Sequence, residues 1–349
     1  MISDRENWLR AIGFGGPEWI PCSVILLPIA WHAHRERLEE LVLRHPSIFP
    51  RYERGSVSFD EFPEFERPGT VTFDNWGCGW RVEIGGAEGQ VVVHPLADWS
   101  ALDTWRPPDP LTKAERADRD WAQVKVDLAE QRRTGQVAMG WGERLFDRLY
   151  ALRGFENLMI DIATDEPRLQ ELIGILTEHE LKLADLWLDA DVDAIAFHTD
   201  IGTQRALMIS PAKFRKHIKP MYAKIFQRVR QAGRHVALST DGHVLEIVDD
   251  LIECGVSMHD PQIRANTLEG IERHYKGRMC INLDLDRQMF MFCTPDDIRS
   301  QIREAVRRLS SPRGGLMMFA AICDGATPLE NIEAICTAME DYCINRMAT

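Results

Sequence analysis

The second half of the sequence alternates short apolar runs with segments of helical periodicity. From about residue 193 onward, each β-branched or apolar run is followed by a polar loop and then by an amphipathic stretch. This order is typical of βα units on a parallel sheet. The strands predicted in this half are 193–197, 235–238, 256–260, 278–283 and 315–320.

Residues typical of helix ends separate these runs. Ser210 before Pro211 predicts an N-cap followed by the first helical residue. Gly255 predicts the end of the helix that follows the strand at 235–238. Residues 294–297 and 327–330 begin with Thr-Pro and open the last two helices, and the second of them fits the capping-box pattern.

Three further strands are predicted upstream, at 20–27, at 136–141 and, as a weaker candidate, at 70–75. Together with the five strands of the second half they make eight, which is the number of strands in a TIM barrel. Residues 30–130 are irregular and rich in Trp, Gly and Pro, and we expect them to cap the C-terminal mouth. The predicted fold class is therefore α/β, a (β/α)8 TIM barrel with an elaborated N-terminal region.

The length and apolar content favour a single domain. With 349 residues and 45% hydrophobic residues, the chain can bury one large core. We predict one domain over residues 1–349. Residues 1–130 supply the first strand or strands and a capping extension, and residues 131–349 supply the remaining βα units.

The charge and the cysteines narrow the class of protein. A formal net charge of −13 argues against nucleic acid as a partner, whereas a small substrate or a protein remains suitable. No run approaches the roughly 18–20 apolar residues of a membrane span, and the start MISDRENWLR is too charged for a secretion signal. The eight cysteines are scattered and are expected to be reduced. A cytoplasmic protein is predicted.

Chemically useful side chains gather where the predicted strands end. In a parallel barrel, catalytic residues lie at these ends and in the loops that follow. The positions read from the sequence are Asp74, Asn75, Trp76, Trp141, His198, Asp200, Asp241, His243, His259, Asp260, Asn282, Asp284, Cys323 and Asp324.

Seven segments together resemble the uroporphyrinogen decarboxylase-like superfamily, and their order and spacing cover nearly the whole chain. They are RENWLRAIGFGGPEWIPC, LVLRHPSIFPRY, FDNWGCGWRVEIGGAEGQVVVHPLADW, LRGFENLMIDIATDEP, HTDIGTQRALMISPAKFRKHIKPMY, LSTDGHVLEIVDDLIECGV and TPLENIEAI.

Two departures from the motifs of this superfamily indicate which of its branches the chain resembles. Uroporphyrinogen decarboxylases carry an Arg-rich segment of the form RQAGRYLPEY after the first strand, whereas this chain reads LLPIAWHAHRERLEE. Thiol-methylating members bind zinc through a His-x-Cys pair and a later Cys. The matching positions here are Ser239, Asp241 and approximately Cys323, so that zinc–thiolate centre is not expected.

The remaining resemblance is to the corrinoid-dependent O-demethylase methyltransferases. It implies cleavage of a small guaiacol- or veratrole-type methyl ether and transfer of the methyl group to the Co(I) cobamide of a corrinoid protein. The implied cofactor is thus a cobamide carried by a partner protein, and the role of zinc stays open. Such a reaction requires an acid for the leaving oxygen and an apolar aromatic slot.

Asp241, His198 and Asp200 are the catalytic candidates. Asp241 follows a strand in a Gly-containing loop and suits an acid or a metal ligand, although an Asp in STDG also suits a helix cap. His198 suits a proton donor whose tautomer Asp200 fixes, although HTDIGTQ also suits a loop held by Asp–backbone hydrogen bonds. Asp241, His243 and Cys323 are the candidate metal ligands.

The predicted substrate contacts are aromatic and polar. Trp76 and Trp141 are expected to hold the substrate ring, with Asn75, Asp260 and His259 nearby. Each of these residues also has a purely structural interpretation, as cover for the barrel mouth or as a loop anchor.

Three other functions remain open at this point: a uroporphyrinogen-type decarboxylase, a zinc-dependent thiol methyltransferase, and a non-catalytic barrel that binds a ligand or a corrinoid protein. The sequence identifies neither the methyl donor nor the oligomeric state, and it leaves a homodimer open.

Overall fold

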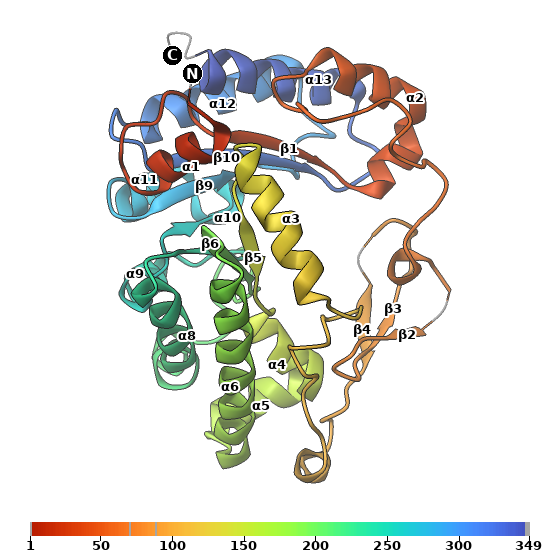
Figure 1. The fold of residues 1–349 in the computed structure, drawn as a ribbon, viewed down its shortest axis with the longest axis vertical. Coiled ribbons are helices and arrows are strands. Elements are labelled where there is room, and N and C mark those ends of the chain that lie inside the picture. Colours follow the sequence, from red (N-terminus) through yellow and green to blue (C-terminus); the bar gives the residue numbers. More distant parts are fainter. Residues whose placement is uncertain (1, 70, 88, 346–349) are drawn as a thin grey trace.

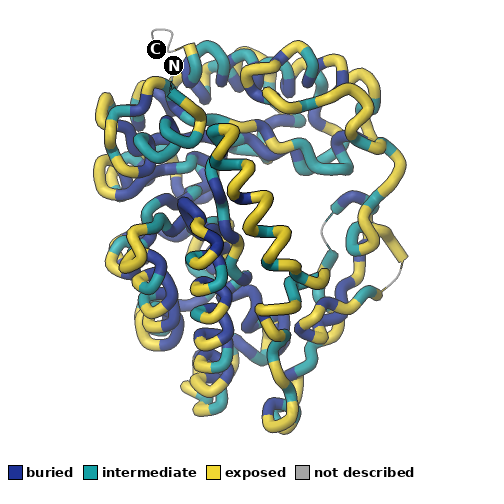
Figure 2. Tube along the Cα trace, in the orientation of Figure 1, coloured by how far each residue is buried: buried dark blue, intermediate teal, exposed yellow. Residues whose placement is uncertain are grey.

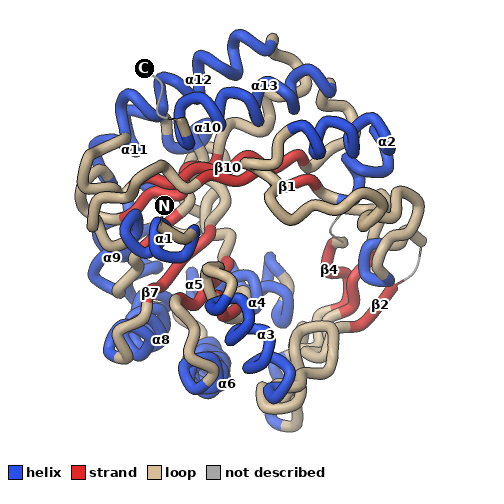
Figure 3. Tube along the Cα trace, turned by 45° about the horizontal axis from the view of Figure 1, so that its top comes forward, coloured by secondary structure: helices blue, strands red, loops and turns tan. Residues whose placement is uncertain are grey.

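The main sheet contains seven parallel strands. The computed structural model describes residues 2–69, 71–87 and 89–345. Within them the strand order is β1-β10-β9-β8-β7-β6-β5. The strands are β1 (Cys22–Leu26), β5 (Met139–Trp141), β6 (Ala194–His198), β7 (His235–Ser239), β8 (Met258–His259), β9 (Cys280–Asp284) and β10 (Leu316–Ile322). The sheet curls with helices around its outside (Figures 1 and 3), which confirms the predicted TIM-type α/β barrel.

The strand predicted at 70–75 forms at Val71–Phe73 but does not join the barrel sheet, so its assignment to the barrel is wrong, and residue 70 lies outside the described residues. β2 (Val71–Phe73) pairs antiparallel with β3 (Gly79–Arg81), which pairs antiparallel with β4 (Gln90–Val93). The Asp74 carboxylate accepts hydrogen bonds from the backbone N–H groups of Trp76 and Cys78. These bonds turn the chain back at once, so the segment forms a hairpin and not a βα unit. Among the described residues, no strand joins β1 to β5.

Helices surround the main sheet. They are α1 (Asp4–Ile12), α2 (Pro28–Arg44), α3 (Trp121–Arg133), α4 (Leu145–Arg153), α5 (Phe155–Thr164), α6 (Pro167–Asp189), α7 (Pro211–Lys213), α8 (Lys219–Gln231), α9 (Val248–Cys254), α10 (Ile263–Asn266), α11 (Leu268–Tyr275), α12 (Pro295–Leu309) and α13 (Leu329–Met339). Short 3₁₀ or π segments are η1 (Glu64–Glu66), η2 (Trp99–Asp103), η3 (Phe214–Ile218), η4 (Leu245–Ile247) and η5 (Glu340–Ile344).

Most of the predicted helix ends are confirmed. The Ser210 hydroxyl accepts a hydrogen bond from the Lys213 N–H, and Gly255 ends α9 in the left-handed conformation. The capping box, however, lies on α12, where Thr294 and Asp297 cap each other's backbone.

The capping box predicted for residues 327–330 is absent. The Thr327 side chain is bonded to the Asp324 carboxylate, and α13 begins after Pro328 without a side-chain cap. The Thr327 hydroxyl therefore bonds the Asp324 carboxylate and does not cap the N-terminus of α13.

Buried positions concentrate on the strands and on the inner faces of the helices (Figure 2). One cluster of buried apolar side chains extends along the chain from Ile20 to Cys343. All eight cysteines are free. No helix in the described parts of the chain has the length and apolarity needed to cross a membrane. The division of the chain near residue 130 stays a prediction.

A buried ionic cluster ties the antiparallel sheet to α4. The Arg148 guanidinium is fully buried and donates hydrogen bonds to Asp74 (3.0 Å), Glu115 (2.7 Å) and Glu143 (3.0 Å). It also packs on the Trp76 ring, 4.7 Å from the ring centroid. The loop after β2 is therefore held against α4 by charge as well as by packing.

Candidate active site

A cavity of about 270 Å³ lies inside the barrel, and all seven strands or their ends contribute to its wall. Alternate residues of a strand face the same side. Met258 and Asp260 accordingly line the cavity, while His259 between them is fully buried on the other side. The cavity wall is mostly apolar, with polar groups such as Ser239 and Asn282 at the strand ends.

Trp141 and His198 form a flat wall of this cavity. Their rings are stacked, with centroids 5.8 Å apart and planes 5° apart. Both side chains are exposed, and both line the cavity. The structure therefore brings together two of the residues that the sequence predicted at the site.

Asp260 is the carboxyl group of this cavity. The Ser239 hydroxyl donates to its Oδ2 at 2.6 Å, and the Thr240 N–H donates to its Oδ1 at 3.0 Å. Burial raises the pKa of Asp260 well above its ordinary value, and the nearby Asp284 carboxylate adds to the shift. This shift favours the protonated form of Asp260, which is the form that can donate a proton into the cavity.

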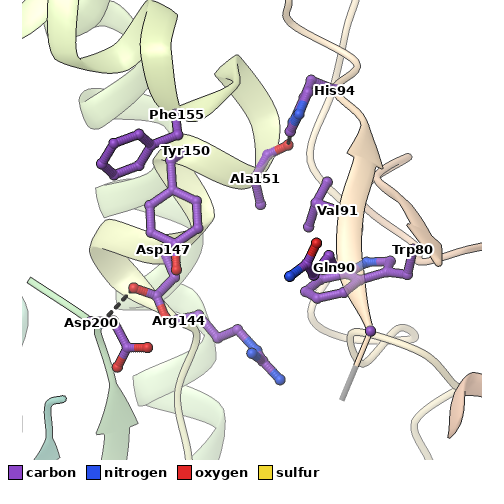
Figure 4. Close-up of a pocket in the computed structure, with 11 residues that line it drawn as sticks. Trp80, Gln90, Val91, His94, Arg144, Asp147, Tyr150, Ala151, Phe155 and Asp200 are labelled. Carbon is purple, nitrogen blue, oxygen red and sulfur yellow. Dashed lines mark hydrogen bonds between the residues drawn. The ribbon is translucent and has the colours of Figure 1, made fainter. Parts of the chain in front are cut away.

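A second cavity of about 370 Å³ lies between α4 and β4 (Figure 4). Asp147 and Tyr150 face it from α4, and Trp80 and Gln90 face it from the antiparallel sheet. Asp200, which follows β6, also lines it. Part of the N-terminal region thus lies at the C-terminal end of β6.

Asp147 and Asp200 form a coupled pair in this second cavity. The Asp200 N–H donates to Asp147 Oδ1 at 2.5 Å. Burial, followed by the charge of Asp200, raises the pKa of Asp147 to about 7. Asp147 is not predicted from the sequence, because nothing in the helical sequence LFDRLY marks an Asp that a loop 53 residues away will cover. The signal that could have identified Asp147 is its position in the first turn of α4, the helix that follows the barrel strand β5.

Replacing Asp147 with asparagine is expected to flatten the pH dependence of stability. Because the folded pKa exceeds the unfolded value of 3.8, this carboxyl stabilises the fold at low pH and loses that contribution as the pH rises toward 7. Between pH 5 and pH 8, the wild type should lose about 1–3 kcal/mol more unfolding free energy than the variant. Urea denaturation at both pH values measures this difference. The exposed Asp118→Asn serves as control, and coincident profiles for wild type and Asp147→Asn would refute the expectation.

The loops after β6 and β7 meet backbone to backbone. The Asp241 N–H donates to Asp200 Oδ1 at 3.1 Å, and the His243 N–H donates to the Thr203 carbonyl at 2.7 Å. A Cβ atom on Gly242 would lie 2.3 Å from the carbonyl carbon of Gly202, and Gly242 has a φ of +82°. Only glycine suits this contact. The contact fixes Asp200 and Asp241 relative to each other.

The Asp241 side chain is half exposed and lines neither of these two cavities. Its Oδ1 accepts hydrogen bonds from Gln262 Nε2 and Arg287 Nη2, both at 2.8 Å. The backbone N–H of Asp241 thus donates to the Asp200 carboxylate, whereas the carboxylate of Asp241 itself is directed toward Arg287.

The three candidate metal ligands do not converge on one point. His243 Nδ1 lies 2.9 Å from the Ala265 carbonyl, and Arg287 stands between Asp241 and Cys323. The described residues contain no group of three or more His, Cys, Asp or Glu placed to hold a metal ion. Ser239, Asp241 and Cys323 therefore do not fit a zinc centre of the thiol-methylating type.

Three predicted substrate contacts line neither of these two cavities. Trp76 is 1% exposed against Arg148, because the hairpin turn directs its indole inward. Asn75 Nδ2 donates to the Ala114 carbonyl at 2.7 Å. His259 lies between Thr240 and Tyr275, and burial lowers its pKa to about 3. Trp76 and His259 are thus buried, whereas Asn75 is exposed and its side chain is bonded to a loop carbonyl.

Comparison with known proteins identifies the family. The uroporphyrinogen decarboxylase (URO-D) family model matches residues 70–342. The chain belongs to the uroporphyrinogen decarboxylase family. Membership in the uroporphyrinogen decarboxylase family confirms the resemblance seen in the sequence and supports an enzymatic function.

Solved structures of similar fold extend the comparison. A methyltransferase from Methanosarcina mazei is 18% identical with a TM-score of 0.63, over 98% of this chain and 99% of that chain. A putative vitamin-B12 independent methionine synthase from Listeria monocytogenes is 12% identical with a TM-score of 0.41, over 62% of this chain and 67% of that chain. A search of curated proteins found no match. The first likeness shows that the two proteins share a fold over nearly the whole chain.

Proposed function

We propose that this chain is a methyltransferase that cleaves a small methoxylated aromatic compound and passes the methyl group to the Co(I) cobamide of a corrinoid protein. The observation that carries the proposal is a carboxyl with a raised pKa, Asp260, in the wall of an apolar cavity that also has the stacked Trp141–His198 pair. The similar fold of a protein described as a methyltransferase adds support.

The cavity suits one aromatic ring. A volume of about 270 Å³ lies near the lower end of the roughly 300–1,000 Å³ that is common for small-molecule pockets. The described residues that line it include no Arg or Lys to bind the carboxylates of a tetrapyrrole. These features favour an uncharged single-ring substrate over the decarboxylase alternative.

In the proposed reaction, the bond between the methyl carbon and the aryl oxygen breaks and its electron pair stays on the oxygen. The Co(I) cobamide supplies the nucleophile that accepts the methyl group. Asp260 gives its proton to the departing oxygen, so the aryloxide leaves as a neutral phenol and Asp260 becomes a carboxylate. Ser239 then stabilises that carboxylate by the hydrogen bond to Oδ2. The Trp141–His198 wall orients the ring.

The roles first predicted for Asp241, His198 and Asp200 stay predictions. The carboxylate of Asp241 is engaged by Arg287 and Gln262, which favours Asp260 as the acid. His198 lines the same cavity and remains a candidate second donor.

A panel of methoxylated aromatics incubated with the enzyme and free cob(I)alamin should yield methylcobalamin, which is followed by its visible absorption. Ring compounds that carry hydroxyl in place of methoxyl are the matched controls and should give none. Decarboxylation of uroporphyrinogen, or methylation of a thiol, without transfer from any ether would refute the proposal. Binding of the panel without any reaction would instead favour the non-catalytic alternative.

A further inference from the structure

Polar residues form a row along the wall of the barrel cavity. The register of the sheet pairs His198 of β6 with Ser239 of β7. Extended by one residue, the pairing of β7 with β8 and of β8 with β9 continues this row to Asp260 and then to Asn282. All four residues line the cavity. Asp260 therefore lies between Asn282 and Ser239, whose hydroxyl donates to Asp260 Oδ2 at 2.6 Å.

The side-chain amide of Asn282 is available to a ligand. It offers two N–H donors and one carbonyl oxygen, and it has no hydrogen-bond partner among the described residues. The residue is half-buried, so a ligand that fills the cavity covers the amide and removes it from water. A polar group that loses water without gaining a partner costs free energy. A suitable ligand therefore presents a polar atom to Asn282.

The place of Asn282 indicates which atom of the ligand it meets. Neighbouring strands lie about 4.8 Å apart. Because the sheet curls around the cavity (Figure 3), the side chains of Asp260 and Asn282 converge inside it. Oxygens on adjacent carbons of an aromatic ring are also close together and point in nearly the same direction. Two side chains that converge in this way suit two such vicinal oxygens.

An oxygen on the far side of the ring would meet a different part of the wall. Because β8 is the middle strand of the seven, the ends of the curled sheet, β1 and β5, face Asp260 across the cavity. These two strands contribute Ile25, Met139 and Trp141, together with Ser23. That side of the cavity is mainly apolar, so it suits an unsubstituted edge of the ring.

We infer that Asn282 determines substrate specificity by binding an oxygen substituent on the ring carbon next to the one that carries the methoxyl group. This inference rests on the proposed function, in which Asp260 meets the ether oxygen. The Nδ2 group of Asn282 donates a hydrogen bond to the second oxygen. Asn282 takes no part in breaking the C–O bond, so its effect is on recognition and orientation of the ring.

The experiment compares ethers that differ in one substituent. Ortho-methoxyphenol presents an oxygen to Asn282, whereas ortho-methylanisole presents a methyl group of similar size. With free cob(I)alamin as acceptor, the wild type should prefer ortho-methoxyphenol, as measured by kcat/KM. Asn282→Leu keeps the approximate volume of the side chain but has no polar atom, and it should reduce this preference roughly 10-fold. Intrinsic differences in leaving-group reactivity cancel, because both proteins act on the same two ethers.

Ser23→Ala is the matched control variant. It removes a hydroxyl from the same cavity, on the side that faces Asp260, and it should retain the preference. Para-methoxyphenol is the matched control ligand, because its second oxygen points away from Asn282, and Asn282→Leu should change its kcat/KM little. An equal loss of preference in Ser23→Ala would overturn the inference.

Binding without turnover separates this inference from the proposed function. Isothermal titration calorimetry compares catechol with ortho-cresol, and the advantage of catechol in the wild type should fall roughly 10-fold in Asn282→Leu. If ethers transfer methyl but Asn282→Leu retains the full preference for the vicinal oxygen, the inference is overturned and the proposed function stands. If no ether transfers methyl but catechol loses its advantage, the proposed function fails, while recognition of vicinal oxygens by Asn282 is supported. Asn282→Ala replaces the leucine variant if circular dichroism shows that the latter does not fold.

Discussion

Replacing Arg148 with methionine is expected to lower the free energy of unfolding by about 3–5 kcal/mol, because breaking a buried ion pair leaves uncompensated charge. Arg148 is fully buried against Asp74, Glu115 and Glu143, so the variant would retain these carboxylates without their shared cation. Equilibrium urea denaturation measures the loss.

The matched control is Arg133→Ala on α3. Arg133 is 72% exposed and pairs with Glu130 one helical turn away. Exposed pairs of this kind contribute about 0–1 kcal/mol. If Arg148→Met lost no more stability than this control, the cluster would not hold the antiparallel sheet in the way its geometry indicates.

Replacing Asp260 with asparagine is expected to lower the methyl-transfer rate by roughly 10²-fold or more and to leave substrate binding largely intact. The amide keeps the shape of the side chain but has no acidic proton for the leaving oxygen. The loss should shrink for ethers whose phenol is a better leaving group, because these need less protonation. Single-turnover rates with free cob(I)alamin across a series of such ethers provide the measurement.

Asp241→Asn separates the two candidate acids. If Asp260 is the acid, Asp241→Asn retains the dependence on the leaving group that the wild type has. If instead Asp241→Asn shows the larger loss and Asp260→Asn transfers at a rate near that of the wild type, the acid is Asp241 and the proposal for Asp260 fails. Asp286→Asn, at the same mouth but paired with Arg264, is the control for a general effect of charge.

Seven of the eight predicted barrel strands are present in the main sheet. They could be predicted because each is an apolar run followed by a polar loop, a pattern that needs no tertiary information. The segment 70–75 shows why the eighth prediction failed. Val71–Phe73 has strand composition like the others, but the Asp74 turn and the pairing with β3 decide which sheet it joins. Trp76 was placed at the mouth only as a consequence of that assignment.

Within the site, residue types were easier to predict than orientations. Asp260 and His259 were both selected at a strand end, but only one face of a strand points into the barrel. Asp147 and Arg287 were not selected, because their roles come from partners 53 and 46 residues away, Asp200 and Asp241. Such pairings depend on how the loops meet at the mouth, and the local sequence pattern does not contain that information.

The backbone contact between Gly202 and Gly242 limits how this mouth can be redesigned. A loop taken from a relative and grafted after β6 would have to leave room for the β7 loop, and the reverse also holds, since a single added Cβ on Gly242 would overlap Gly202. The two loops are therefore a single exchangeable unit. A library that varies either loop will retain folded members more often if it keeps both Gly202 and Gly242.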